Sequence, residues 1–170
     1  VLPDTTFLEL SDADWDRTYR LVLDSAIRMT RRVLPGMIEG GFGRLIYFTS
    51  SGVIRPLPGM HLSNVMRSAV QGLARSLVTE VGPHGVTTHV LAPGHIDTER
   101  RRRMTEHRAK QRGVPTEQVD QAELATVAVG RFGTAADQAA HVAFLSTDKA
   151  GYQTGQTPRV DGGLPYSIPR

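Results

Sequence analysis

Cysteine is absent from the sequence, which excludes disulfide bonds and metal sites built on thiolates. The chain also has no apolar run long enough to cross a membrane and no signal-peptide pattern at its start. From these absences we expect a cytoplasmic protein that has neither a metal site nor a membrane partner. The formal net charge of +3 is modest and by itself implies no nucleic-acid partner.

What is present is ordinary for a soluble globular protein. The 170 residues are 39% hydrophobic and 22% charged. The sequence therefore predicts one domain over residues 1–170, and its function has to be argued from local patterns.

A helix between two strands forms the centre of the predicted fold. Apolar side chains recur at helical spacing over residues 62–81, a pattern that only an α-helix can bury on one face. The short apolar and aromatic run at 45–48 predicts a buried strand before it, and residues 86–91 form a second predicted strand after it. Strand, helix and strand in this order predict a βαβ unit, and we expect its ligand site at the carboxyl ends of the strands.

Three further elements are predicted around this unit. A helix follows from the cap pattern that begins at Ser11, and Pro35 is predicted to end it. Thr134 is placed to cap a later helix. Residues 156–160 form the last predicted strand.

Five stretches of the sequence resemble the C-terminal part of a short-chain dehydrogenase/reductase, a family of Rossmann-fold oxidoreductases that depend on NAD or NADP. Their order and spacing match the family together, and the resemblance covers nearly all of the chain. It implies an α/β fold, namely the C-terminal part of a doubly wound Rossmann-like parallel sheet with the N-terminal βαβ half missing. The five stretches are residues 43–51, 69–77, 83–86, 92–98 and 131–163.

In the family, the missing half carries the glycine-rich loop that binds the cofactor's pyrophosphate. The nearest glycine cluster here, residues 40–43, lies between a predicted helix and a predicted strand, the reverse of the order that a phosphate-binding loop needs. The cluster therefore indicates a helix stop and a turn. The resemblance implies NAD or NADP as cofactor, with NADP slightly favoured, and the chain looks like a fragment or a truncated gene product.

Only one of the family's four catalytic positions is preserved. The catalytic serine falls on Ser50, the signature tyrosine on Ser63 and the lysine that follows it on Arg67. The asparagine that often completes the set falls on Val22. The resemblance thus gives Ser50, Ser63 and Arg67 as the candidate catalytic residues, and Arg67 also as a candidate for holding the cofactor's ribose.

No shift of register restores the signature motif, because the residues four positions before the chain's two lysines are Glu106 and Leu145. A serine hydroxyl is a much weaker acid than a tyrosine, and loss of a positioned general acid lowers a rate by about 10²–10⁴-fold. Arg67 can hold a ribose hydroxyl or an oxyanion, but it does not exchange protons at neutral pH. Residues 63–67 resemble a minority subgroup, similar to 3-oxoacyl-[acyl carrier protein] reductases, whose catalytic set is imperfect.

Two functions are compatible with these replacements. The first is an NAD(P)-dependent oxidoreductase that reduces a carbonyl, such as that of a 3-oxoacyl thioester, with Ser50 and Ser63 bound to the carbonyl oxygen. A water molecule, His61 or His95 then supplies the proton, since histidine suits that role near neutral pH. Each histidine has the alternative of an exposed bystander. The second function is that of a catalytically impaired relative, acting as a non-catalytic homo-oligomeric or nucleotide-binding protein.

Four residues match the family's loop beneath the nicotinamide, where backbone groups and a threonine hydroxyl hold the carboxamide. They are Pro93, Gly94, Ile96 and Thr98, which together with Arg67 are the candidate cofactor-binding residues. The alternative is a strand end followed by a turn, which explains Pro93 and Gly94 but gives no reason for Thr98.

Residues 99–112 are rich in arginine, and the resemblance places them in a lid over the substrate, at about 99–130. One interpretation is a solvated charged face. Another is a docking surface for an anionic carrier, such as acyl carrier protein or the phosphates of coenzyme A. Nucleic-acid binding is the third, disfavoured because no aromatic residue lies between the arginines. The resemblance also implies a homodimer or homotetramer and a small-molecule or acyl-carrier-linked substrate.

Overall fold

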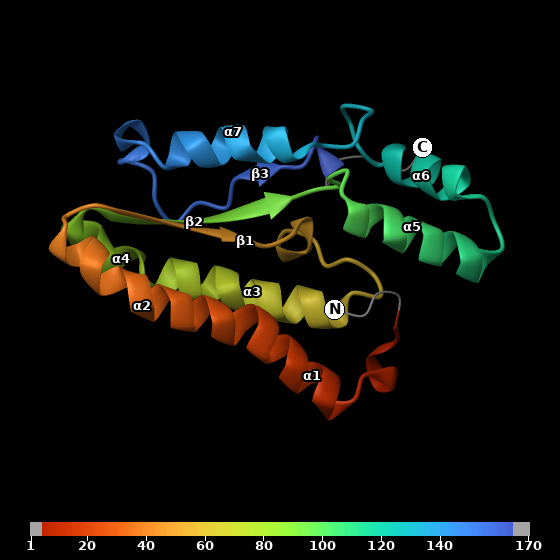
Figure 1. The fold of residues 1–170 in the computed structure, drawn as a ribbon, viewed down its shortest axis with the longest axis horizontal. Coiled ribbons are helices and arrows are strands. Elements are labelled where there is room, and N and C mark those ends of the chain that lie inside the picture. The colour runs from red at the N-terminus through yellow and green to blue at the C-terminus, as the bar shows by residue number, and fades with distance from the viewer. Residues whose placement is uncertain (1–4, 165–170) are drawn as a thin grey trace.

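The computed structural model describes residues 5–164, which form a three-stranded parallel sheet with helices on both faces (Figure 1). The strands lie in the order β1-β2-β3, and the middle strand β2 is buried along almost its whole length. A strand covered on both faces is expected to be apolar throughout, and β2 departs from this at Thr87, Thr88 and His89, which are buried polar residues. The strands are β1 (Gly43–Phe48), β2 (Val86–Pro93) and β3 (Arg159–Val160).

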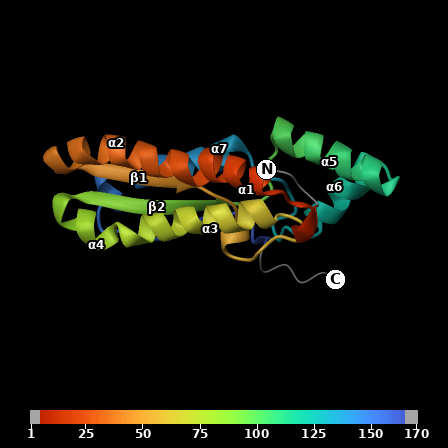
Figure 2. The ribbon, with the colours of Figure 1, turned by 90° about the horizontal axis from the view of Figure 1, so that it is seen from below.

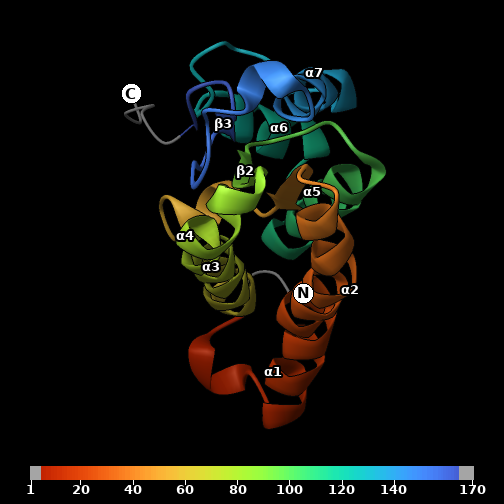
Figure 3. The same cartoon turned by 90° about the vertical axis from the view of Figure 1, so that its left-hand side faces the viewer.

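Two long helices cover one face of the sheet and a third covers the other (Figures 1 and 3). On the first face, Leu45 and Val86 pack with side chains of α2 and with Val81. On the second face, Leu91 packs against Leu145 of α7. The helices are α1 (Asp12–Thr18), α2 (Ser25–Glu39), α3 (His61–Ser76), α4 (Val78–Val81), α5 (Glu99–Arg112), α6 (Thr116–Leu124) and α7 (Ala135–Leu145).

The helices α5 and α6 form a pair beyond the carboxyl ends of β1 and β2, away from the layered part of the molecule (Figure 2). A π-helical segment, Tyr19–Asp24, joins α1 to α2. The predicted Rossmann-like α/β sheet is confirmed, and the predicted βαβ unit is β1, α3 with α4, and β2. No helix within residues 5–164 combines the length and the apolar character that crossing a membrane requires.

Both predicted helix caps are confirmed. The Ser11 hydroxyl accepts a hydrogen bond from the backbone N–H of Asp14, whose carboxylate bonds back to Ser11. Thr134 and Asp137 form the same reciprocal box at the start of α7. Each box satisfies backbone donors that a helix start leaves without an intrahelical partner.

The prediction that Pro35 ends the helix beginning at the Ser11 cap is wrong, because α2, the last part of that helical stretch, runs through Pro35 to Glu39. A proline inside a helix removes one hydrogen bond, but Pro35 lies on the exposed side, where water can satisfy the freed carbonyl. Gly40 is the C-cap of the helix, and Gly41 follows with a φ of 64°, a left-handed conformation that glycine adopts at little cost. The cluster at 40–43 is thus the helix stop and turn that its position predicted.

The last strand is shorter than the predicted 156–160. Backbone hydrogen bonds run from Val90 to Gln156 and from Ala92 to Pro158, so the segment follows β2, but only Arg159–Val160 is a regular strand. Pro158 has no N–H to donate, which interrupts the ladder.

His89, in the middle of β2, is fully buried. Burial lowers the pKa of His89, and the backbone of Gln153 opposes this, while the charges of Arg44 and His141 lower it further. As the pH falls below the ordinary value of 6.5, the unfolded chain takes up a proton that the folded chain refuses. The free energy of unfolding should therefore fall below that pH.

We predict that His89→Leu makes this pH dependence shallower. Urea unfolding at several pH values between about 7.5 and 5 measures it. His84→Leu, at an exposed position, is the matched control. The same slope in both variants would assign the effect to other groups, such as His95.

Candidate active site

Ser63 and Arg67 lie one turn apart on α3, at the end of the helix near the carboxyl end of β1. The Arg67 Nε donates a hydrogen bond of 3.1 Å to the Ser63 Oγ. Residues four positions apart on a helix are neighbours on its surface, so the spacing alone brings the two groups together. Ser63 is buried, at 6% exposure, and Arg67 is half-buried.

The Arg67 guanidinium also reaches the sheet. Its Nη1 donates to the backbone oxygens of Phe48, at 3.3 Å, and Thr49, at 3.0 Å. These are the two residues immediately before Ser50. Arg67 therefore joins the start of α3, with Ser63, to the end of β1, which Ser50 follows directly in the chain.

Ser50 is held by the turn that follows β1. Its Oγ accepts a hydrogen bond of 3.1 Å from the backbone N–H of Gly52. A Cβ at Gly52 would lie 2.7 Å from the Asn64 Oδ1, which indicates why a glycine is needed there. Asn64 in turn bonds both backbone groups of Leu57 and so ties the loop to α3.

The two serine hydroxyls share a property that matters for catalysis. Each oxygen accepts a hydrogen bond from a fixed donor, Arg67 for Ser63 and Gly52 for Ser50. Neither hydroxyl donates a hydrogen bond to any group within residues 5–164. Both hydrogens are consequently free to be donated to an oxygen of a bound molecule.

Val22, at the family's asparagine position, lies in the π-helical segment before α2. It lines a cavity of about 380 Å³ together with Arg67. Its side chain has no hydrogen-bonding group, so this wall of the site contributes shape and no polar contact.

The loop after β2 is fixed by two neighbouring segments. The backbone N–H of Asp97 donates to the oxygen of Gly133 at 2.8 Å, and Ile96 forms a parallel bridge with Gly133. Thr98 caps α5, because its side chain accepts a hydrogen bond of 3.3 Å from the backbone N–H of Arg101. Capping is a structural reason for Thr98 that the sequence interpretation lacked, and its hydroxyl hydrogen stays available for a ligand.

Gly94 is packed against the end of β3. A Cβ at this position would lie 2.8 Å from Cα, Cβ and O of Asp161, two of which are backbone atoms that cannot move aside easily. We predict that Gly94→Ala lowers the free energy of unfolding by about 1–3 kcal/mol, the usual cost of overpacking. Chemical denaturation measures the change.

Gly72→Ala is the matched control for Gly94→Ala. Nothing lies within 4 Å of a Cβ built at Gly72, which is an exposed position inside α3. We expect this variant to gain about 0.5–1 kcal/mol, since alanine favours a helix interior over glycine. Equal stability of the two variants would contradict the packing argument.

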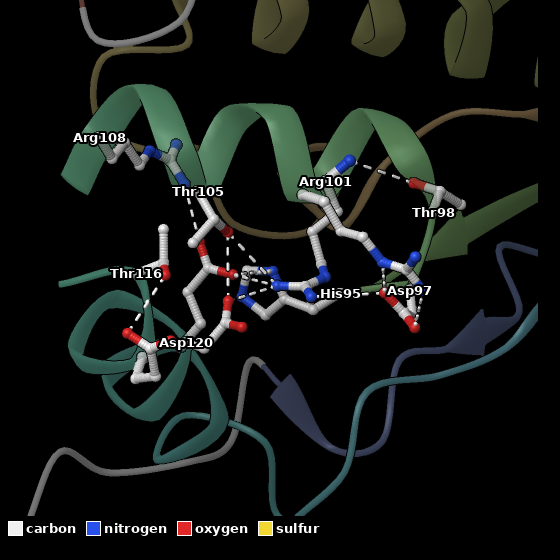
Figure 4. A network of polar contacts seen from close by, with 11 residues as sticks. His95, Asp97, Thr98, Arg101, Thr105, Arg108, Thr116 and Asp120 are labelled. Carbon is white, nitrogen blue, oxygen red and sulfur yellow. Dashed lines mark hydrogen bonds and ion pairs between the residues drawn. The ribbon is translucent and has the colours of Figure 1, made fainter. Parts of the chain in front are cut away.

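The basic stretch 99–112 forms an ion-pair network on the inner side of α5 (Figure 4). The Arg101 Nη1 lies 2.6 Å from the Asp120 Oδ1 and 3.7 Å from the Glu123 Oε2, both on α6. Its Nη2 lies 3.4 Å from the Asp97 Oδ1, and its guanidinium stacks 3.8 Å from the centre of the Phe132 ring. The interpretation of the stretch as a solvated face is incomplete, because the Arg101 side chain is only 12% exposed and links three segments.

The two candidate histidines contact other groups than the serine pair. The His95 Nδ1 lies 3.9 Å from the Glu123 Oε2, and its ring meets that of Phe132 edge-on. Burial lowers the pKa of His95, and the Glu123 charge opposes that change. His61 is the first residue of α3 and packs edge-on against Phe7. His95 thus belongs to the α5–α6 network.

Parallel strands with helices on both faces define a Rossmann-like α/β protein, a class whose ligands bind at the carboxyl ends of the strands. The group formed by Ser50, Ser63 and Arg67 lies at such an end. A family model described as Enoyl-(Acyl carrier protein) reductase matches residues 1–165. The chain belongs to the short-chain dehydrogenase/reductase family.

Three relatives illustrate the similarity. The short-chain reductase protein NovJ of Streptomyces niveus is 35% identical over 162 residues, covering 95% of this chain and 60% of the relative. The 3-oxoacyl-[acyl-carrier-protein] reductase FabG of Haemophilus influenzae is 35% identical over 161 residues, covering 95% of this chain and 62% of the relative. The structure of L-sorbose reductase from Gluconobacter frateurii, solved with NADPH and L-sorbose, matches with a TM-score of 0.89 at 25% identity. The match covers 99% of this chain and 64% of that chain.

The chain therefore spans 60–62% of the length of these two curated relatives. All three relatives are reductases, which does not favour the alternative of a non-catalytic protein.

Sequence reasoning missed the residues that support the site from a distance. Gly52 and Asn64 fix the Ser50 turn, and Asp120 and Glu123 receive the arginines of α5. The carboxylates recur at a spacing of three on a segment whose apolar pattern was poor, and that spacing next to an arginine-rich helix was the available signal.

Proposed function

We propose that this protein reduces a carbonyl group with NAD(P)H, a 3-oxoacyl thioester being the substrate class that the name of its FabG relative suggests. The observation that carries the proposal is the pair of serine hydroxyls whose oxygens are fixed by Arg67 and Gly52 and whose hydrogens are free. Two such donors are what a carbonyl oxygen needs as negative charge develops on it.

Arg67 strengthens this arrangement. Its hydrogen bond to Ser63 is charge-assisted, which draws electron density from the hydroxyl oxygen and makes that hydroxyl a better donor. Its fixed positive charge also lies next to the oxyanion position. The bonds to the carbonyls of Phe48 and Thr49 keep the guanidinium in place, so little reorganisation accompanies the reaction.

The proton for the product alcohol comes from water in this proposal. Arg67 does not exchange protons at neutral pH, and a serine hydroxyl is a weak acid. His95 is engaged with Glu123 and Phe132, and His61 with Phe7. A water molecule next to Ser63 is the remaining source.

The loop residues Pro93, Gly94, Ile96 and Thr98 and the Arg67 side chain would hold the nicotinamide end of the cofactor. Their backbone is fixed by Gly133 and the end of β3, and the Thr98 hydroxyl hydrogen is free to donate. NADPH or NADH, when bound, supplies the hydride. We propose NADPH as the preferred form.

The test is oxidation of NADPH and NADH by the full-length protein with the neutral thioester S-acetoacetyl-N-acetylcysteamine. We expect turnover, followed by the absorbance of the reduced nicotinamide. Ser50→Ala should lower kcat by about 10²–10³-fold, the loss that removal of one oxyanion donor causes. Absence of turnover by the unaltered protein over a panel of 3-oxoacyl thioesters and ketones would refute the proposal.

A further inference from the structure

Two arginines from different elements line the cavity of about 380 Å³ that Val22 also lines. Its walls are the π-helical segment and the start of α2, the edge strand β1, and α3. Arg67 enters it from α3 and Arg100 from the first turn of α5. The lining includes no aspartate or glutamate, and its other polar side chains are Ser25 and Tyr47.

Arg100 differs from the arginines beside it. Arg101, Arg102 and Arg103, which follow it directly, are each paired with a carboxylate, on Asp120, Asp97 and Glu99 in that order. Among the residues that the structure describes, Arg100 has no ion-pair or hydrogen-bond partner. Counter-charges for the other three arginines come from α6, from the loop before α5 and from Glu99, whereas the exposed Arg100 lines the cavity.

Arg67 has no carboxylate among its hydrogen-bond partners in the described residues. Its hydrogen-bond partners are a hydroxyl and two backbone carbonyls, all of which are neutral. Burial lowers the pKa of Arg67, and the nearby charge of Arg100 lowers it further. Two guanidinium groups that repel each other across a cavity without a carboxylate are stabilised by a bound anion, because an anion offsets both the repulsion and the desolvation.

We propose that Arg67 and Arg100 together bind an anionic group of the substrate, a carboxylate or a phosphate. The inference rests on the proposed reduction of a carbonyl, and it assigns a substrate with a negative charge close to that carbonyl in place of a neutral 3-oxoacyl thioester. Guanidinium groups suit this role because their planar donors match the oxygens of both anions.

The position of Arg67 sets where that charge must lie. Its Nε holds the Ser63 hydroxyl, which faces the carbonyl oxygen in the proposed reaction, and its other side lines the cavity. An anion between Arg67 and Arg100 is therefore a near neighbour of the carbonyl, as in a 3-oxo acid. The distant phosphates of coenzyme A do not meet this requirement.

The test compares Arg100→Gln with Arg112→Gln in the full-length protein, with NADP⁺ bound. Arg112 is an exposed arginine of the same helix, so both variants lose one charge, but only Arg100 lines the cavity. Calorimetry measures the Kd of three probes: acetoacetate, its neutral methyl ester and inorganic phosphate. We expect Arg100→Gln to weaken acetoacetate and phosphate by about 10–100-fold, the effect of a lost charge-assisted hydrogen bond, and to leave the ester unchanged.

Arg112→Gln should change none of the three constants. Equal acetoacetate binding by Arg100→Gln and the unaltered protein would overturn the inference. So would an equal loss for the ester and the acid. A loss confined to NADP⁺ affinity would overturn it as well, because the anion would then belong to the cofactor.

These binding measurements are independent of turnover, which separates this inference from the proposed function. Anion binding that depends on Arg100 without any NADPH oxidation would refute the reductase and keep the site. Turnover of neutral thioesters that does not depend on Arg100 would support the reductase and refute the anion site.

Discussion

Replacing Ser63 with tyrosine and Arg67 with lysine together in the full-length protein should raise kcat for carbonyl reduction by about 10²–10⁴-fold, the contribution of a positioned general acid. A phenol is a stronger acid than a serine hydroxyl, and a neighbouring ammonium favours its ionised form. Lysine at position 67 is needed as well, because Ser63 is 6% exposed and its hydroxyl touches the guanidinium. The more compact ammonium leaves room for the ring.

The matched control is Ser63→Phe with Arg67→Lys, which has the same ring without the hydroxyl. Steady-state oxidation of NADPH measures both double variants. We expect a gain for the tyrosine variant alone, together with a new ionisation in its pH profile. Equal rates for the phenylalanine and tyrosine variants would show that position 63 does not face the carbonyl.

The parts of this site that the sequence predicted are those fixed by local geometry. The spacing of four between Ser63 and Arg67 puts them on one face of a helix, and Ser50 ends a short apolar strand. Parallel pairing of β1 with β2 then places that strand end beside the loop after Pro93. The shape of the βαβ unit follows from hydrophobic periodicity, which is why its elements were predicted correctly.

The parts that the sequence did not predict depend on contacts between distant segments. Successive helix residues point about 100° apart, so adjacent arginines meet different neighbours, and no local pattern distinguishes Arg100 from Arg101. Asp120 and Glu123 come from a separate helix whose docking the sequence does not reveal. Pro35 was misread for a related reason, since its tolerance depends on which side of α2 faces water.

Arg101→Leu should release α5 from α6. The Arg101 side chain, 12% exposed, lies 2.6 Å from Asp120 and 3.7 Å from the Glu123 carboxylate, which is itself 13% exposed. Removing one partner of a buried ion pair costs about 3 kcal/mol or more, because the remaining charge stays buried without its counter-charge. Glu123 keeps Arg108 at 2.8 Å, so we place the effect at that lower end.

We expect this loss to act locally. The helix pair lies beyond the sheet, and the two described cores, which α2, α4 and α7 form with the strands, contain no residue of α5 or α6. Amide hydrogen exchange in α5 and α6 should therefore accelerate by about 100-fold, the equivalent of 3 kcal/mol, while β1 and β2 keep their protection. Leucine keeps an apolar side chain against Phe132, so the change in exchange rate reports the loss of the Arg101 charge and of its hydrogen bonds.

Arg103→Leu is the control, because its side chain is 72% exposed and its partner Glu99 is 79% exposed. An exposed pair contributes little, so its exchange pattern should match that of the unaltered protein. Faster exchange throughout the sheet in Arg101→Leu would mean that the network supports the whole fold. Unchanged exchange in α5 and α6 would mean that apolar contacts alone hold the pair. The predicted pattern, confined to the two helices, would show that Arg101 holds α5 against α6 and, through Asp97, contacts the loop that follows Pro93.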